Sequence, residues 1–404
     1  MYATAIIGGG AAGLMLATKL LKKFDGNNII LFERGERVGR KLSATGNGQG
    51  NITNLHVTEG GYFSSNPDGV ARANQIISAY DNQSLDNFFS DLGVILTADD
   101  RGRVYPASRQ ASSLTDALRF YLAARGADIA TGTLVTGIEK KGDGFVIRYK
   151  KTDSSNNFYC QAKTVVLCTG GTAAKNFGSD GSGYALARSF GHTVTELYPS
   201  LVQLKTDTTP IKGLKGIRVN DAKLTAYTPN GKKSVVGDVI FTEYGVSGDA
   251  VFRLTPYIAG KNLEGTKLEI DFLPQIDEGE IAKKLTYKTA EFSVSAQDAF
   301  YGIINNQIGR AILRITGNLN QSAALIKRFP LQVTGSLGFD YAQVTKGGVP
   351  LSEVDKNLQS RFADGLYFAG EILDVDGECG GYNLQWAYSS ACTVAAAIGS
   401  EFKK

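Results

Sequence analysis

A run of glycines near the start of the chain has the spacing of a phosphate-binding turn. The apolar segment Tyr2–Ile7 is typical of a buried parallel strand, and Gly8, Gly10 and Gly13 follow it as a helical pattern begins. These glycines permit a tight turn, let the backbone approach a pyrophosphate and let helix and strand pack closely, while the helix N-terminus attracts phosphate. Glu33 ends a second predicted strand, where its carboxylate can accept hydrogen bonds from a ribose. The pattern predicts a dinucleotide site, with NAD and FAD both open; a plain glycine-rich strand–helix turn is the alternative.

The polar segment that follows is suited to a large ligand. Residues 35–54 read GERVGRKLSATGNGQGNITN, and their glycines and asparagines can present backbone N–H groups and side-chain amides. A plain NAD-binding unit would continue into a third strand soon after the second, so this long loop favours FAD. A solvated surface loop is the alternative. The candidate ligand residues in and beside this segment are Arg34, Arg40, Lys41, Asn47, Gly48 and Asn51.

From Arg40 to Asn54 the chain resembles the signature R-K-x-x-x-(S/T)-G-x-G-(R/Q)-x-N-x-T-N of the aminoacetone oxidase family, a group of flavoproteins with two dinucleotide-binding domains. Gln49 and Gly50 stand where the family usually has Arg-Cys, so no arginine or cysteine role is carried to these positions. The resemblance covers essentially the whole chain and implies FAD as the cofactor. It also implies an α/β fold: a Rossmann-like FAD-binding domain of the GR2 type with a β-meander, interrupted by a β-barrel-like and helical insertion.

The domain boundaries follow from a change in the character of the sequence, which becomes rich in Thr, Val and turn residues after residue 192 and mostly helical after residue 277. We expect the FAD-binding domain over residues 1–191 and 336–404, a β-rich insertion on the substrate side over 192–276, and a helical insertion over 277–335. The FAD-binding domain should contain a helix over Ser113–Arg125 and strands over Ala127–Ile138, Phe145–Lys150 and Phe158–Leu167.

Two further glycine turns fit the same cofactor by resemblance. Gly170 and Gly171 end an apolar strand, and Gly370-Glu371 looks like the C-terminal flavin motif, in which the acid binds the ribityl or pyrophosphate end. A helix expected over Leu384–Ile398 would direct its positive end at the N1–C2=O edge of the flavin. The alternative is a strand–loop–helix that only closes the sheet. The cofactor contacts that the resemblance adds are Ala12, Val135 (through its backbone), Thr169, Gly170, Gly171, Gly370, Glu371, Gly381, Asn383 and Leu384.

Composition and charge argue against several other classes of protein. The net charge is only +4, and the insertion over 192–335 carries 17 Lys and Arg against 14 Asp and Glu, so no nucleic-acid partner is expected. Four cysteines without a CxxC pair and two histidines predict neither a metal site nor a dithiol centre. No apolar stretch is long enough to span a membrane, and a cytoplasmic protein is expected.

The resemblance implies a flavin-dependent amine oxidase that uses dioxygen and converts aminoacetone, or a similar small primary amine, to a carbonyl product, ammonia and hydrogen peroxide. One alternative is an NAD(P)H-dependent flavin reductase acting on an activated C=C bond. A second is a flavoprotein whose insertion binds RNA or a protein. No catalytic base is identified. Tyr382 and Trp386 are candidates to line the substrate site, with core aromatic residues as the equal alternative, and a structural role is the favoured interpretation of His192.

Overall fold

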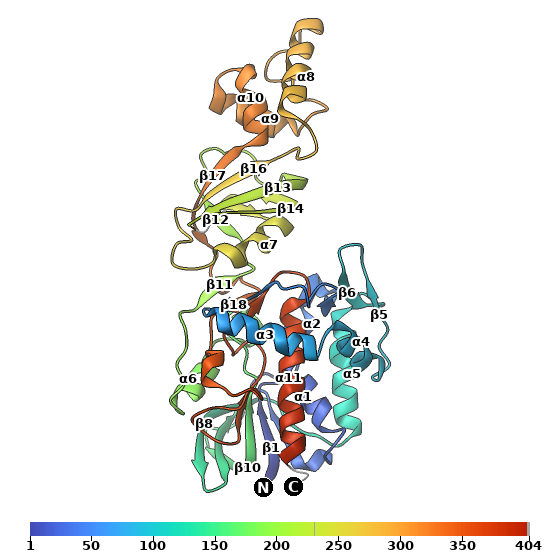
Figure 1. Cartoon of the computed structure of the whole chain (residues 1–404), viewed down its shortest axis with the longest axis vertical. Coiled ribbons are helices and arrows are strands. Elements are labelled where there is room, and N and C mark those ends of the chain that lie inside the picture. Colours follow the sequence, from blue (N-terminus) through green and yellow to red (C-terminus); the bar gives the residue numbers. More distant parts are fainter. Residues whose placement is uncertain (230, 402–404) are drawn as a thin grey trace. The chain divides into compact units, whose positions relative to one another are not determined.

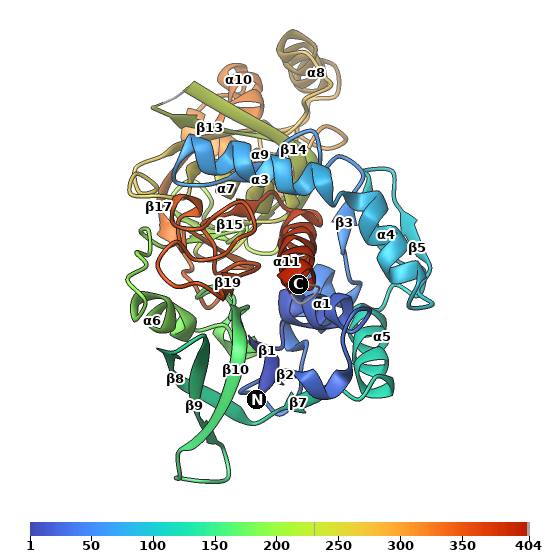
Figure 2. The ribbon, with the colours of Figure 1, turned by 60° about the horizontal axis from the view of Figure 1, so that its bottom comes forward.

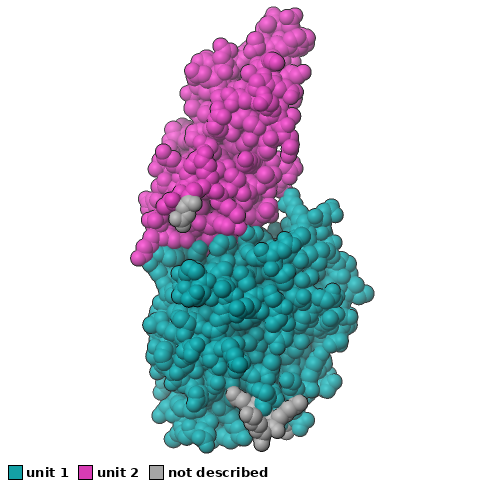
Figure 3. Space-filling view, in the orientation of Figure 1, with its two compact units in different colours: residues 1–198, 344–404 teal, residues 199–343 magenta. Residues whose placement is uncertain are grey.

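A computed structural model describes residues 1–229 and 231–401, and Figure 1 and Figure 2 show it from two directions. The chain divides into two compact units, Met1–Tyr198 with Val344–Lys404 and Pro199–Gln343 (Figure 3). These divisions fall several residues after the expected boundaries at 191/192 and 335/336. We call the first the sheet unit and the second the barrel unit.

The sheet unit is built on a seven-stranded mixed sheet, as the sequence predicts for a Rossmann-like domain with a β-meander (Figure 2). Parallel pairing joins β7, β2, β1, β10 and β19, while β10, β9 and β8 form the antiparallel meander. The strands, in sheet order with β19 also paired to β10, are β7 (Asp128–Ala130), β2 (Ile29–Phe32), β1 (Tyr2–Ile7), β10 (Phe158–Leu167), β9 (Gly144–Lys151), β8 (Thr133–Lys141) and β19 (Leu366–Phe368). The predicted fold class is therefore confirmed.

One predicted strand is wrong. Ala127–Ile138 was expected to be continuous, but it contains all of β7 and the first part of β8, which are separated by a turn at Gly132 with φ 59°. The first part pairs with β2 and the second pairs with β9, and these strands lie toward opposite ends of the sheet order, so one continuous strand cannot make both pairings. Glycine adopts this left-handed conformation without a steric penalty.

Helices cover the sheet, and two of them lie side by side along it in both views: α1 (Ala11–Leu20) and α11 (Tyr382–Glu401). Eight of the ten residues of α1 are buried, because it packs against both the sheet and its neighbours. The other helices of this unit are α2 (Arg40–Ser43), α3 (Pro67–Ala79), α4 (Asn82–Ser90), α5 (Ala111–Ala124) and α6 (Ser182–Arg188). Its short strands are β3 (Thr53–Asn54), β4 (Tyr62–Phe63), β5 (Leu96–Ala98), β6 (Arg103–Pro106), β18 (Val344–Lys346) and β20 (Asp376–Gly377). The division between the units falls within β11 (Tyr198–Ser200), which pairs with β18.

The barrel unit is a closed six-stranded barrel with its own apolar core. Its strands, in barrel order, are β12 (Leu204–Thr206), β15 (Gly245–Ser247), β14 (Gly231–Phe241), β13 (Arg218–Thr228), β16 (Lys267–Asp271) and β17 (Phe329–Ser336). Helix α7 (Asp249–Ile258) follows β15. Three α-helices and one 3-10 helix lie between β16 and β17: α8 (Glu278–Glu291), α9 (Asn306–Thr316), η4 (Leu319–Gln321) and α10 (Ser322–Lys327). The expected barrel-like and helical insertion is thus present.

The end of the helical insertion differs from the expectation. Residues 329–335 were assigned to it, yet they belong to β17, which closes the barrel between β16 and β12. Phe329, Leu331 and Val333 are buried and the residues between them are exposed. This alternation is the period of a strand with one face in a core. Among the helices of residues 1–229 and 231–401, none has the length and apolar character needed to cross a membrane.

Candidate functional site

Four parallel strands of the sheet unit end at the same level. Ile7 lies opposite both Phe32 and Leu167, and Leu167 lies opposite Phe368. The segments that leave these strands, beginning at residues 8, 33, 168 and 369, therefore emerge at one edge of the sheet. In open α/β sheets, ligands bind in the crevice outside the carboxyl ends of the strands. The three glycine turns and Glu33 found in the sequence all belong to this edge.

The first glycine turn has two glycines that packing requires and one that it does not. A Cβ on Gly8, where φ is 111°, would lie 2.4 Å from the carbonyl oxygen of Cys168, and one on Gly13 would lie 2.0 Å from that of Gly8. A Cβ on Gly10 would meet no protein atom within 4 Å. Gly10 is also the N-cap of α1 and has no side-chain cap. The open face of Gly10 thus fits a diphosphate approaching the helix N-terminus.

Glu33 is held in place by two backbone N–H groups. Its Oε2 accepts a hydrogen bond from Gly9 at 3.0 Å, and its Oε1 accepts one from Gly35 at 2.7 Å. Each carboxylate oxygen can accept more than one hydrogen bond, so both keep capacity for a ribose hydroxyl. The acid therefore fits the role that its place at the end of β2 predicts.

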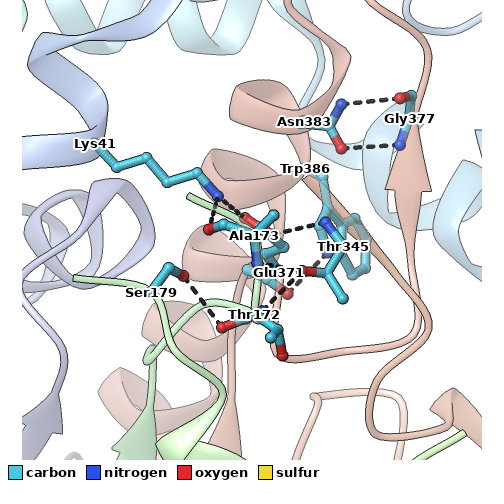
Figure 4. Close-up of polar contacts among 11 residues, drawn as sticks. Lys41, Thr172, Ala173, Ser179, Thr345, Glu371, Gly377, Asn383 and Trp386 are labelled. Carbon is cyan, nitrogen blue, oxygen red and sulfur yellow. Dashed lines mark hydrogen bonds and ion pairs between the residues drawn. The ribbon is translucent and has the colours of Figure 1, made fainter. Parts of the chain in front are cut away.

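Three cations after β2 contact acceptors on segments that follow other strands of the sheet. Arg34 forms a 2.5 Å ion pair with Asp180, and the guanidinium of Arg40 donates to the carbonyl of Asn176 at 2.7 Å. Lys41 forms a 2.7 Å ion pair with Glu371, shown in Figure 4. The expected cofactor ligands thus have protein partners in this structure. Sequence reasoning did not identify Asp180 or Asn176.

The second and third glycine turns are joined through Thr345. Its hydroxyl oxygen accepts hydrogen bonds from the backbone of Thr172 at 2.8 Å and Ala173 at 2.9 Å, and its own N–H donates to Glu371 at 2.9 Å (Figure 4). A Cβ on Gly171 would lie 2.4 Å from this hydroxyl oxygen. Glycine is therefore required at 171 for the approach of Thr345. The sequence pattern assigns Glu371 to a flavin motif but does not identify Thr345 as the residue whose N–H binds its carboxylate.

The N-terminus of α11 is held against the loop by backbone packing. A Cβ on Gly381, where φ is 103°, would lie 2.2 Å from the carbonyl oxygen of Thr53. The side chain of Asn383 makes two 2.9 Å hydrogen bonds to the backbone of Gly377, so it closes the segment before the helix (Figure 4). Leu384 is partly buried in the first turn. The positive end of α11 is thereby held near the polar loop.

The two aromatic candidates of α11 differ in what they contact. Trp386 is 1% exposed and its indole N–H donates to the carbonyl of Gly370 at 3.1 Å, so it braces the third glycine turn. Tyr382 is 8% exposed and packs against Tyr62 with ring centroids 5.5 Å apart. Trp386 thus keeps almost no surface for a ligand.

The polar loop presents its backbone in a left-handed run. Gly46, Asn47 and Gly48 have φ values of 58°, 54° and 83°. Glycine adopts such values without a steric penalty, and asparagine is one of the few other residues that does so readily. Asn51 is buried and donates to the carbonyls of Thr53 and Val104 at 3.0 Å, so it holds the end of the loop in place.

Two other expected contacts lie in β8 and just after β10. Val135 is 7% exposed in β8, beside the bulge between residues 135 and 137. The hydroxyl of Thr169 is buried and has no hydrogen-bond partner within the described residues; a Cβ on Gly183 would lie 1.8 Å from it. Thr169 therefore packs against the start of α6.

Two buried titratable groups lie elsewhere in the sheet unit. His192 contacts Glu353 at 3.1 Å and Ser360 at 2.7 Å; burial lowers its pKa below the ordinary value, although Glu353 opposes this. Burial raises the pKa of the Asp374 carboxyl group, although hydrogen bonds that this group accepts from Ser65 oppose the shift. The contacts of His192 agree with a structural role. Within residues 1–229 and 231–401, no group of three His, Cys, Asp or Glu could hold a metal ion.

Comparisons with known proteins agree with this geometry. The family model described as the HI0933-like protein Rossmann domain matches residues 2–397. A 3-dehydro-bile acid delta(4,6)-reductase of Clostridium scindens is 35% identical over 411 residues, covering 96% of this chain and 97% of the relative. A ribosomal RNA dihydrouridine synthase of Haemophilus influenzae is 29% identical, covering 98% of each chain. The crystal structure of a 3-ketosteroid-delta4-(5alpha)-dehydrogenase from Rhodococcus jostii RHA1 has a TM-score of 0.50 at 16% identity, covering 98% of this chain and 97% of that one, and so shares the fold.

Proposed function

Because the chain belongs to the HI0933-like Rossmann-domain family and is an FAD-dependent oxidoreductase, we propose that it reduces a C=C bond conjugated to a carbonyl group. The observation that carries this proposal is the similarity, along almost the whole chain, to the Clostridium scindens reductase. The prediction of FAD as cofactor is confirmed. The amine oxidase expected from the loop signature stays a prediction, and the reductase considered beside it becomes the first choice.

The names of the two relatives share one chemistry. A double bond at position 4 or at positions 4 and 6 of a 3-oxo steroid is conjugated to the carbonyl. Dihydrouridine differs from uridine by two hydrogens added across a ring C=C bond that is likewise conjugated to a carbonyl. In both cases a hydride adds to the end of the C=C bond that lies farther from the carbonyl along the conjugated system, and a proton adds to the nearer end. Reduced FAD supplies such a hydride when bound.

We assign the carboxyl edge of the sheet as the place where this chain binds FAD. Gly10 and the N-terminus of α1 would receive the diphosphate, and Glu33 the adenosine ribose. The N-terminus of α11 would favour negative charge on the ring side. We retain Tyr382 as a wall of the substrate site and assign Trp386 to bracing the turn at Gly370.

Anaerobic spectroscopy separates reduction from amine oxidation. The yellow protein should be bleached by NADH or NADPH and regain its colour when a 3-oxo-4-ene steroid is added, with a product that has gained two hydrogen atoms. A uridine-containing RNA in place of the steroid tests the second relative's substrate class. If aminoacetone bleaches the protein while neither acceptor reoxidises it, the reductase proposal is wrong and amine oxidation is supported.

A pair of tyrosine variants tests the assignment of the substrate wall. Tyr382→Phe should raise KM for the acceptor while the rate of flavin reduction by NAD(P)H stays unchanged. Tyr159→Phe is the control, because Tyr159 is 62% exposed and lies near the start of β10, at the end of the strand opposite to the carboxyl edge. Equal KM values in the two variants would remove Tyr382 from the substrate site and leave the reaction type untouched.

A further inference from the structure

The loop from Thr172 to Gly181 joins the second glycine turn to α6, and its two ends are close together. The N–H of Gly181 donates to the carbonyl of Gly171 at 2.9 Å, and the hydroxyl of Ser179 donates to the same carbonyl at 3.2 Å. We call residues 172–181 the strap. Its base is thus closed by hydrogen bonds to Gly171.

The rest of the strap is held by side chains from the segment after β2. Arg34 contacts Asp180, Arg40 contacts the carbonyl of Asn176, and Lys41 lies 3.5 Å from the carbonyl of Ala173. These three contacts are spread along the strap, and each has a cation as donor. No strand ladder joins the strap to this segment in the described part of the chain.

Strand order shows what these contacts cross. In the sheet, β1 lies between β2 and β10, and neighbouring strands are about 4.8 Å apart, so the ends of β2 and β10 are about 10 Å apart. Arg34 follows β2 and Asp180 belongs to the loop that follows β10. A contact between them therefore spans the end of β1, where the turn Gly8–Gly13 begins.

We propose that the strap retains FAD, and that the Arg34–Asp180 ion pair is the latch that closes it over the adenosine half of the cofactor. The proposal rests on FAD lying along the carboxyl edge, as assigned above. Asp180 and Asn176 then act as positioning residues for the cofactor. Release of FAD requires the latch to open.

The latch is accessible to salt. The side chains of Arg34 and Asp180 are 30% and 37% exposed. Burial raises the pKa of Asp180, but the hydrogen bonds from Arg34 and Ser182 outweigh it and leave the pKa below its ordinary value. The pair is therefore charged at neutral pH, and dissolved ions screen a pair of this exposure. We expect its loss to accelerate FAD release about fivefold, the scale of one exposed ion pair.

The variant Asp180→Asn removes the charge and keeps the local fold. Asp180 also accepts a hydrogen bond from the N–H of Ser182 at 3.0 Å, which the asparagine oxygen can still accept. Asp116→Asn is the matched control, because it breaks another arginine ion pair, to Arg119 at 3.0 Å on α5.

FAD release is measured on the purified holoprotein after dilution into an excess of a flavin-binding apoprotein, by following flavin fluorescence at low salt and at about 1 M salt. Asp180→Asn should release FAD faster than wild type and Asp116→Asn at low salt, and all three should converge at high salt. Equal rates at low salt would overturn the latch. Faster release at every salt concentration would also overturn it, because that result indicates a disturbed fold. A wild-type protein that holds no FAD would instead refute the assignment of FAD to the carboxyl edge.

Discussion

Two alanine substitutions in the first glycine turn should separate folding from cofactor binding. A Cβ at residue 13 would lie 2.0 Å from a backbone oxygen, whereas one at residue 10 would meet nothing within 4 Å. Gly10 also has φ −79° and ψ −167°, a conformation that alanine adopts freely. We therefore expect Gly13→Ala to destabilise the protein. Gly10→Ala should weaken FAD binding and leave the unfolding of the apoprotein unchanged.

The magnitudes follow from these contacts. In Gly13→Ala the start of α1 must move by about 1 Å from β1, and overpacking of this kind costs about 1–3 kcal/mol, or roughly 2–4 °C in Tm for each kcal/mol. In Gly10→Ala the apoprotein loses a favourable N-cap and gains rigidity in its unfolded state, two effects of under about 1 kcal/mol that oppose each other. Displacing one charged hydrogen bond to phosphate costs about 1.5–3 kcal/mol, which raises the Kd for FAD by roughly ten- to hundredfold.

Calorimetry of the apoproteins gives the two Tm values, and titration followed by quenching of flavin fluorescence gives the two Kd values. Each variant serves as the control of the other, since both add one methyl group to the same turn. If Gly10→Ala bound FAD as tightly as wild type, the diphosphate could not lie at the N-terminus of α1. If Gly10→Ala lost as much Tm as Gly13→Ala, the open face of Gly10 would be refuted.

Four further substitutions, one of them a control, test charges of the sheet unit. Lys41→Met should destabilise the apoprotein by about 1–2 kcal/mol and raise the Kd for FAD, because it leaves the 19% exposed carboxylate of Glu371 without its cation. Lys22→Met is the control: it breaks a more exposed ion pair and should change neither the Tm nor the Kd. The free energy of unfolding should fall as the pH falls below about 6.5, because the pKa of His192 is lowered in the folded state and only the unfolded chain binds the proton. This fall is at most about 1.4 kcal/mol per pH unit for one group. His192→Gln should flatten the accompanying decrease of Tm. Asp374→Asn should keep or raise Tm at pH 7, because the raised pKa of Asp374 means that its charged form is disfavoured, and the gain should shrink as the pH falls toward about 4.

Different results would contradict each of these. Equal effects of Lys41→Met and Lys22→Met would mean that the pair with Glu371 contributes no more than a surface contact. An unchanged pH slope in His192→Gln would place the titration in other groups. A large loss of Tm in Asp374→Asn at pH 7 would show that the carboxylate charge stabilises the fold.

The elements that could be predicted from the sequence are those whose signal is local. Tyr2–Ile7 and Phe158–Leu167 are strands with the predicted bounds, because each is an apolar run that ends at or near a glycine turn. The helix predicted over Ser113–Arg125 is Ala111–Ala124. Ala127–Ile138 failed because its pattern does not show which neighbour each half pairs with. The barrel helix Asp249–Ile258 was missed, since it contains Pro256 inside an otherwise β-rich segment.

The glycine turns of the site could be found for the same reason. A glycine such as Gly13 or Gly171 is required by a backbone approach that no other residue permits, so the residue type itself carries the information. The type of a charged residue carries less information about its partner, because a lysine or an aspartate can pair with many other residues. Lys41 and Glu371 are separated by 330 positions. Nothing local in either segment indicates the pair.

Sheet topology supplies what the local pattern lacks. Once β2, β1, β10 and β19 are known to be parallel neighbours, the residues that follow each strand must share one edge, whatever their separation in sequence. Cations that follow β2 then face acceptors that follow β10 and β19, and Arg34 with Asp180 and Lys41 with Glu371 become natural partners. Strand order therefore restricts the partners of these charges to segments at one edge, and the course of the loops, such as the strap that carries Asp180, decides which of them meet.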